Sequence, residues 1–88
     1  MKISIDCQEI SERKQLHETL AAALNFPEYY GKNLDALFDC LTELPEVLEL
    51  TLQHWAAAEA ALGDYGLAAR QTFENAMEED PDLTVIFA

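Results

Sequence analysis

The residues Pro27-Glu28-Tyr29-Tyr30-Gly31-Lys32-Asn33-Leu34-Asp35-Ala36-Leu37-Phe38-Asp39-Cys40-Leu41-Thr42 contain the central helix of the predicted fold. Asn33 can begin that helix, because its side-chain oxygen can accept a hydrogen bond from a first-turn amide. Apolar residues then recur at i, i+3, i+4 and i+7, which predicts one buried face. These residues are Leu34, Leu37, Phe38 and Leu41. A neighbouring face is polar and acidic and consists of Asp35, Asp39, Thr42 and Glu43. We therefore expect one helix that packs into a core and presents carboxylates beside it.

The segments on either side of this helix alternate between strand and helix patterns. Strands are expected at residues 2–6, 47–52 and 83–87, where β-branched and apolar residues alternate or cluster. Helices are expected from a cap at Ser11 to Asn25, around 55–62 and around 66–79. Strands joined by helical crossovers pair in parallel, and such crossovers are right-handed. The prediction is one α/β domain over residues 1–88, with a three-stranded parallel sheet and about four helices.

The charge of the chain is strongly negative and unevenly distributed. Seventeen acidic and five basic residues give a net charge of −12. Residues 1–32 contain five acids and four bases, a net of −1, whereas residues 33–88 contain twelve acids and one base, a net of −11. Such a charge repels nucleic acid and anionic lipid and attracts a basic protein. The alternative is that the acidity serves only to keep the protein soluble.

The two cysteines, Cys7 and Cys40, indicate a reducing compartment. A chain of 88 residues can bury a sufficient core without a disulfide, although the sequence leaves their pairing open. No apolar run approaches the length of a membrane span, and the N-terminus does not resemble a signal peptide. We therefore expect a cytoplasmic protein that is monomeric when free.

The acidic residues admit more than one interpretation. Asp35 is explained by the helix dipole alone, whereas Asp39 lies a full turn deeper and gains little from it. Glu78, Glu79 and Asp80 follow one another at an expected helix end, where carboxylates are unfavourable and a functional surface is one explanation. Paired carboxylates can also serve catalysis or bind a metal. However, no nucleophile or metal-ligand spacing accompanies them, so we expect neither an enzyme nor a cofactor.

The remaining polar and aromatic candidates are interpreted structurally. His17 and His54 are expected on helix surfaces or at the core edge, and Cys40 on the side of its helix away from the acids. Of the adjacent Tyr29 and Tyr30, one is expected to face outward, because tyrosine is enriched at binding hot spots.

Taken together, these motifs resemble the barstar family, intracellular inhibitors of the secreted ribonuclease barnase. The similarity is concentrated in residues 27–31, 33–37 and 39–42 and extends over essentially the whole chain. It implies a three-stranded parallel sheet with helices, and an acidic helix that occludes a ribonuclease active site. In this family the residue that matches Asp39 is the central anchor and takes the place of a substrate phosphate. The complete set of expected partner-binding residues is Tyr29, Asn33, Asp35, Phe38, Asp39, Thr42, Glu43 and Glu79.

Several positions depart from the family pattern. Phe38 replaces a tryptophan, the loop after Thr42 is shorter, and Glu43-Leu44 replaces a Gly-Trp pair. These changes bear on which nuclease is bound rather than on the mode of binding. We therefore expect a one-to-one complex with a basic, barnase-like extracellular ribonuclease. The alternative is an immunity protein (antitoxin) against a different basic toxin. A carrier protein is disfavoured, because no serine occurs between Asn33 and Ala36 to hold a prosthetic arm.

Overall fold

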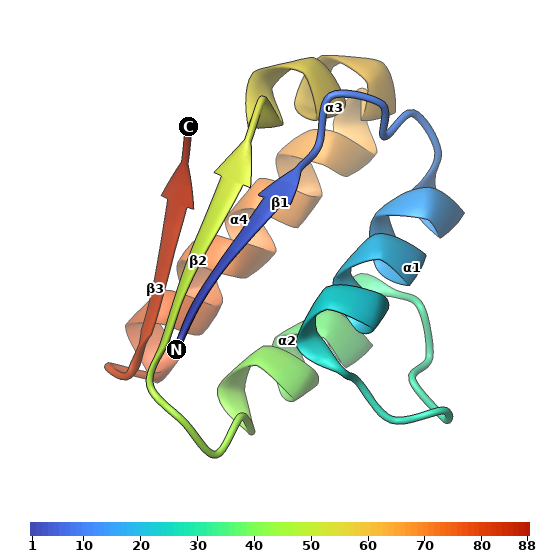
Figure 1. The fold of residues 1–88 in the computed structure, drawn as a ribbon. Coiled ribbons are helices and arrows are strands. Elements are labelled where there is room, and N and C mark those ends of the chain that lie inside the picture. The colour runs from blue at the N-terminus through green and yellow to red at the C-terminus, as the bar shows by residue number, and fades with distance from the viewer.

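The computed structural model describes all residues 1–88 and contains three strands and four helices (Figure 1). In chain order they are β1 (Lys2–Asp6), α1 (Arg13–Leu24), α2 (Leu34–Thr42), β2 (Leu48–Gln53), α3 (Trp55–Leu62), α4 (Asp64–Glu79) and β3 (Leu83–Phe87). The strands form one parallel sheet in the order β1-β2-β3. The α/β fold expected from the sequence, with a three-stranded parallel sheet and four helices, is therefore confirmed.

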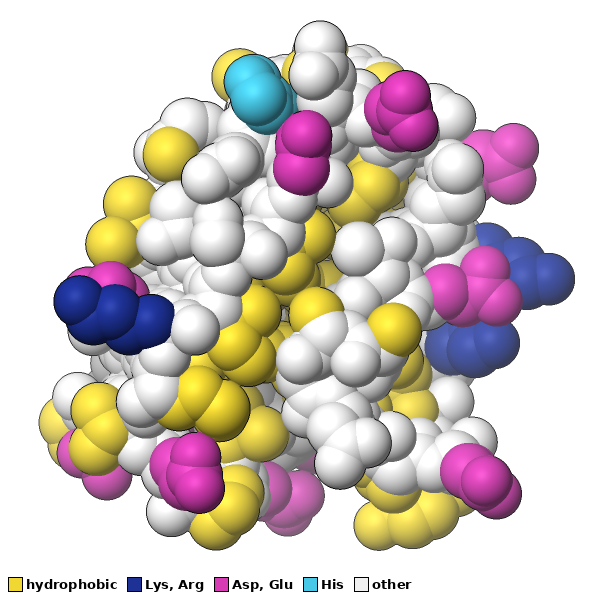
Figure 2. All heavy atoms as spheres, viewed as in Figure 1, with side chains coloured by type: hydrophobic (Ala, Val, Ile, Leu, Met, Phe, Trp, Pro, Cys, Tyr) yellow, Lys and Arg dark blue, Asp and Glu magenta, His cyan; other side chains and the backbone are white.

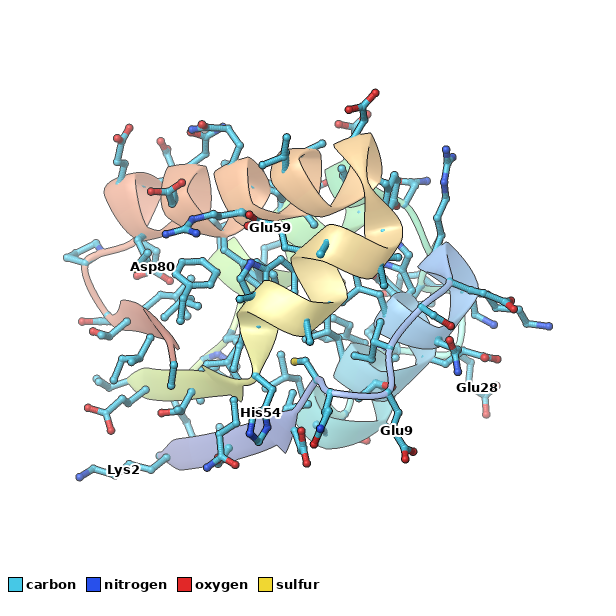
Figure 3. The ribbon with its side chains drawn as sticks, turned by 90° about the horizontal axis from the view of Figure 1, so that it is seen from above. Lys2, Glu9, Glu28, His54, Glu59 and Asp80 are labelled. Atoms are coloured by element: carbon cyan, nitrogen blue, oxygen red, sulfur yellow. The ribbon has the colours of Figure 1, made fainter.

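The helices cover one face of the sheet, as the view from above in Figure 3 shows. The central strand β2 explains this arrangement, since Leu48, Leu50 and Leu52 are buried while the intervening Glu49 and Thr51 are partly exposed. Its neighbours are in register, with Ile5 of β1 opposite Leu52. Alternation with period two thus assigns apolar side chains to the helical layer and polar ones to the open face. None of the four helices has the length and hydrophobicity that a membrane span requires.

An aromatic cluster anchors α3, α4 and β3 to one another. Trp55 begins α3 and is buried, and its ring centroid lies 5.8 Å from those of Phe73 and Phe87. The indole Nε1 donates a hydrogen bond of 2.9 Å to Glu59, so this buried polar group is satisfied. Gly66 permits the close packing of α3 on α4, because a Cβ at this position would lie 2.8 Å from the Cα of Glu59.

The element boundaries differ slightly from the expected ones. α1 begins at Arg13, and its N-cap is Glu12 rather than Ser11. The Gln15 side chain accepts hydrogen bonds from the backbone amides of Ser11 and Glu12, which fixes this start. α4 begins at Asp64 rather than Gly66, since Gly63 with φ of 62° already ends α3 and admits the turn.

The expectation that His17 lies on a helix surface or at the core edge is wrong. Its side chain is completely buried, and its two ring nitrogens each lie 2.6 Å from a tyrosine hydroxyl, that of Tyr30 and that of Tyr65. His54 is exposed, as expected for a surface residue, and pairs with Asp6 at 3.0 Å.

Candidate partner-binding surface

The loop from Asn25 to Asn33 and the helix α2 form the candidate surface. Asn33 is the N-cap of α2, and its Oδ1 accepts a hydrogen bond of 2.7 Å from the Ala36 amide, as the sequence predicts. Its Nδ2 donates to the Gly31 carbonyl at 3.3 Å, which ties the loop to the helix. A Cβ at Gly31 would lie 3.2 Å from this Nδ2, so the glycine permits the close approach of the loop. The Asn33 side chain is therefore engaged in holding the start of the helix.

Tyr29 and Tyr30 point in opposite directions. Tyr29 is 88 % exposed, whereas Tyr30 is buried with its ring centroid 4.9 Å from that of Phe26. The prediction that one of the two faces outward is confirmed. A tyrosine with so much free area on a well-anchored loop is suited to bury apolar and polar surface together on binding.

A groove of about 460 Å³ lies between this loop and α2. Asp39 and Glu43 border it from the helix, one turn apart, and Tyr29 and Gly31 border it from the loop. Cys40 also lines the groove, so the expectation that it faces away from the acids is wrong. Burial and the nearby carboxylates of Glu43 and Asp39 raise the pKa of the Cys40 thiol. The remaining lining residues are Asn25, Phe26, Pro27, Tyr30, Ala36 and Leu44.

The carboxylates of this surface have no cationic partner within the chain. Ion pairs engage Lys2, Lys32 and Arg70, and their acidic partners are Glu49, Glu18, Glu59 and Glu74. Asp35, Asp39 and Glu43 are exposed and belong to none of these pairs. Two like charges at i, i+4 on one helix repel each other. The folded chain therefore presents uncompensated negative charge at the groove.

Thr42 and Phe38 contribute less free surface than expected for binding residues. The Thr42 hydroxyl donates to the Phe38 carbonyl at 2.9 Å, within its own helix, so its proton is already used. Phe38 is partly buried and packs against the hydrophobic core. Both side chains border the acidic face, with part of their surface still accessible.

Glu79 lies outside the groove, at the C-terminal end of α4. α2 packs against α4, and each of these helices is followed by a short turn into a parallel strand. Both helices consequently end at the same edge of the sheet, as Figure 1 shows. Asp80 is accounted for by its turn, because its Oδ1 accepts a hydrogen bond of 2.9 Å from the Asp82 amide. Glu78 and Glu79 are exposed without such a partner.

A second groove, of about 390 Å³, lies close to the first but differs in chemistry. It is bordered by Ile3 of β1, Leu24 of α1 and Leu44, with Glu46 as its one charged side chain. Hydrophobic side chains form a band between β1 and α1 in Figure 2. This groove therefore lacks the charge that distinguishes the groove beside Tyr29.

Sequence reasoning found the exposed residues of the surface but not the groove itself. Gly31, Cys40 and Leu44 line it, and none was expected to take part in binding. A signal was available for Cys40, since Ala36, Cys40 and Glu43 recur at i, i+4 and i+7 on one side of α2. No three His, Cys, Asp or Glu side chains converge as metal ligands would.

The protein is a small α/β domain whose helices cover one face of a three-stranded parallel sheet. Its second helix is acidic, and an exposed tyrosine lies on the loop before that helix. The family model described as "Barstar (barnase inhibitor)" matches residues 1–88, and the chain belongs to this family. A protein of Bacillus subtilis (strain 168) named "Putative ribonuclease inhibitor YrdF" is 40 % identical over 84 residues. That alignment covers 92 % of this chain and 90 % of the relative.

Proposed function

We propose that this protein inhibits a basic, barnase-like ribonuclease by forming a one-to-one complex that occludes the active site. In this proposal Asp39 and Glu43 meet cationic groups of the nuclease, and Tyr29 packs against its surface. The Asp39 carboxylate takes the place of a substrate phosphate. The inhibitor acts inside the cell that makes the nuclease.

The observation that carries this proposal is the uncompensated charge of the groove. Asp39 and Glu43 lie one turn apart without a cation from their own chain, beside a tyrosine that is 88 % exposed. A ribonuclease active site must be basic to bind phosphates, so it offers the complementary charge. Membership of the barstar family and the name of the Bacillus subtilis relative support the same target class.

Inhibition of barnase, used as the probe nuclease, tests the proposal directly. Replacing Asp39 with Ala removes one partner of a desolvated charge pair, which costs about 2–5 kcal/mol, or a roughly 30- to several-thousand-fold weaker inhibition. Glu9 is the matched control, because it is exposed and has no ion-pair partner. Glu12, another exposed acid of the N-terminal part, is unsuitable as a control because it caps α1. Equal losses for Asp39→Ala and Glu9→Ala would refute the assignment of the anchor.

The salt dependence of association tests the electrostatic part separately. The association rate constant should fall steeply as the salt concentration rises from 10 mM to 500 mM, because screening shortens the range of the acidic field.

The alternative is an immunity protein against a different basic toxin. It would be supported if the folded protein inhibits no basic ribonuclease but binds another basic toxin at the same groove.

A further inference from the structure

His17 is the only buried polar or charged residue of the chain, and both of its ring nitrogens are engaged. Nδ1 lies 2.6 Å from the hydroxyl of Tyr30, and Nε2 lies 2.6 Å from the hydroxyl of Tyr65. The three side chains come from α1, the loop before α2, and α4. One continuous set of hydrogen bonds therefore connects three segments that are distant in sequence.

The chemistry of the three groups assigns a direction to this chain of hydrogen bonds. A neutral imidazole has one donor and one acceptor nitrogen. Tyr30 is buried, so its hydroxyl hydrogen needs a partner inside the protein, and Nδ1 is the acceptor available. Nε2–H then donates to Tyr65, which is partly exposed and can donate onward to water. This assignment leaves no buried donor unpaired.

Tyr30 transmits this constraint to the binding loop. Its amide donates to the Pro27 carbonyl at 2.9 Å, and its ring packs on Phe26. Tyr29 is the preceding residue, and its exposed side chain makes no hydrogen bond that could hold it. The position of Tyr29 therefore depends on how firmly Tyr30 is held.

We propose that Tyr65 is a positioning residue for partner binding, which acts through His17 and Tyr30 to fix the loop that presents Tyr29. The effect on binding rests on the proposed function, whereas the effect on the loop does not. Tyr65 itself does not line the groove and lies in the first turn of α4. It is about 21 Å along the helix from Glu79, at 1.5 Å per residue. We therefore expect a change at Tyr65 to affect partner binding through its hydrogen bond to His17 rather than through the groove itself.

The test compares Tyr65→Phe with Val85→Ala in the full-length protein. Tyr65→Phe removes one hydroxyl and keeps the ring, including its contact with Arg13, whose guanidinium carbon lies 4.5 Å from the ring centroid. Val85→Ala truncates a buried side chain of β3 and serves as a control for lost stability alone. Amide hydrogen exchange at Tyr30 is measured in the free protein. Dissociation constants with barnase are measured where both variants are fully folded.

We expect Tyr65→Phe to accelerate exchange of the Tyr30 amide about five- to tenfold and to weaken binding by a similar factor, as for the loss of one hydrogen bond. Val85→Ala should leave both unchanged. Unaltered exchange at Tyr30 in Tyr65→Phe would overturn the inference, as would equal effects of the two variants. If the wild-type protein fails to bind any basic ribonuclease while exchange still accelerates in Tyr65→Phe, the proposed function is wrong but the positioning of the loop stands.

Discussion

Replacing Glu43 with Gln should stabilise the free protein, although Glu43 belongs to the proposed binding surface. Glu43 is the C-cap residue of α2, where the negative end of the helix dipole opposes a carboxylate by about 0.3–1 kcal/mol. It also lies one turn from Asp39, and a like-charge pair at this spacing costs about 0.2–0.5 kcal/mol. No ion pair offsets either term. The sum predicts a gain of about 0.5–1.5 kcal/mol in the free energy of unfolding.

Urea denaturation followed by the fluorescence of Trp55, the sole tryptophan and a buried one, measures this gain at low salt. Asp35→Asn is the matched control on the same helix. Asp35 lies in the first turn, where a carboxylate is favourable, so its replacement should cost about 0.3–1 kcal/mol. Both variants remove one negative charge, and only the placement on the helix differs.

The signs of the two stability changes distinguish a local helix-dipole effect from relief of the overall charge. If both variants gain stability equally, relief of the overall charge of −12 is responsible and the local assignment is wrong. The difference between the variants should also shrink in 1 M salt, where screening acts within about 3 Å. Against a basic ribonuclease, Glu43→Gln should bind more weakly than the wild type despite its greater stability.

Three further predictions concern the core and the thiols. Gly66→Ala should destabilise the protein by several kcal/mol in urea denaturation, because the new Cβ would overlap backbone atoms of Glu59 that cannot move alone. Burial lowers the pKa of His17 below its ordinary value of 6.5, so the unfolded chain takes up this proton first as the pH falls. His17 should therefore lower the free energy of unfolding as the pH falls below 6.5, and this decrease should be smaller in His17→Gln. Iodoacetamide should modify Cys40, which lines the groove, well before Cys7, whose pKa burial raises to about 11; mass spectrometry of the labelled peptides distinguishes the two.

The local patterns of this sequence predict its elements well and its buried polar contacts poorly. Trp55–Leu62 and Leu83–Phe87 have the expected bounds, because Gly63 follows the first and Pro81 lies just before the second. The burial of His17 depends on two tyrosines 13 and 48 residues away, which no local pattern reveals. A weaker signal was nevertheless present, since His17 recurs with Leu20 and Leu24 at i, i+3 and i+7 on the buried face of α1.

In the candidate surface too, features set by neighbouring residues were predictable, whereas contacts between distant segments were not. Asn33 and Asp35 follow from rules that apply within one helical turn, so their positions were predictable. The groove forms between the loop that bears Tyr29 and the side of α2 that bears Cys40. Its existence depends on the path of the loop, which the cap at Asn33 and the buried Tyr30 determine together. Periodicity places a residue on a face but does not show what lies opposite it.

The parallel topology places the acidic residues Glu43 and Glu79 at the same end of the sheet. α2 and α4 both end at the edge of the sheet where β2 and β3 begin, so the negative ends of two helix dipoles lie there. Glu43 and Glu79 add carboxylates to these ends instead of the cations that would favour the free chain. Under the proposed function, this arrangement lowers the stability of the free protein and strengthens the field that a basic nuclease meets. The nuclease then supplies the positive charge that the chain lacks, so binding should stabilise the fold by more than contact area alone would suggest.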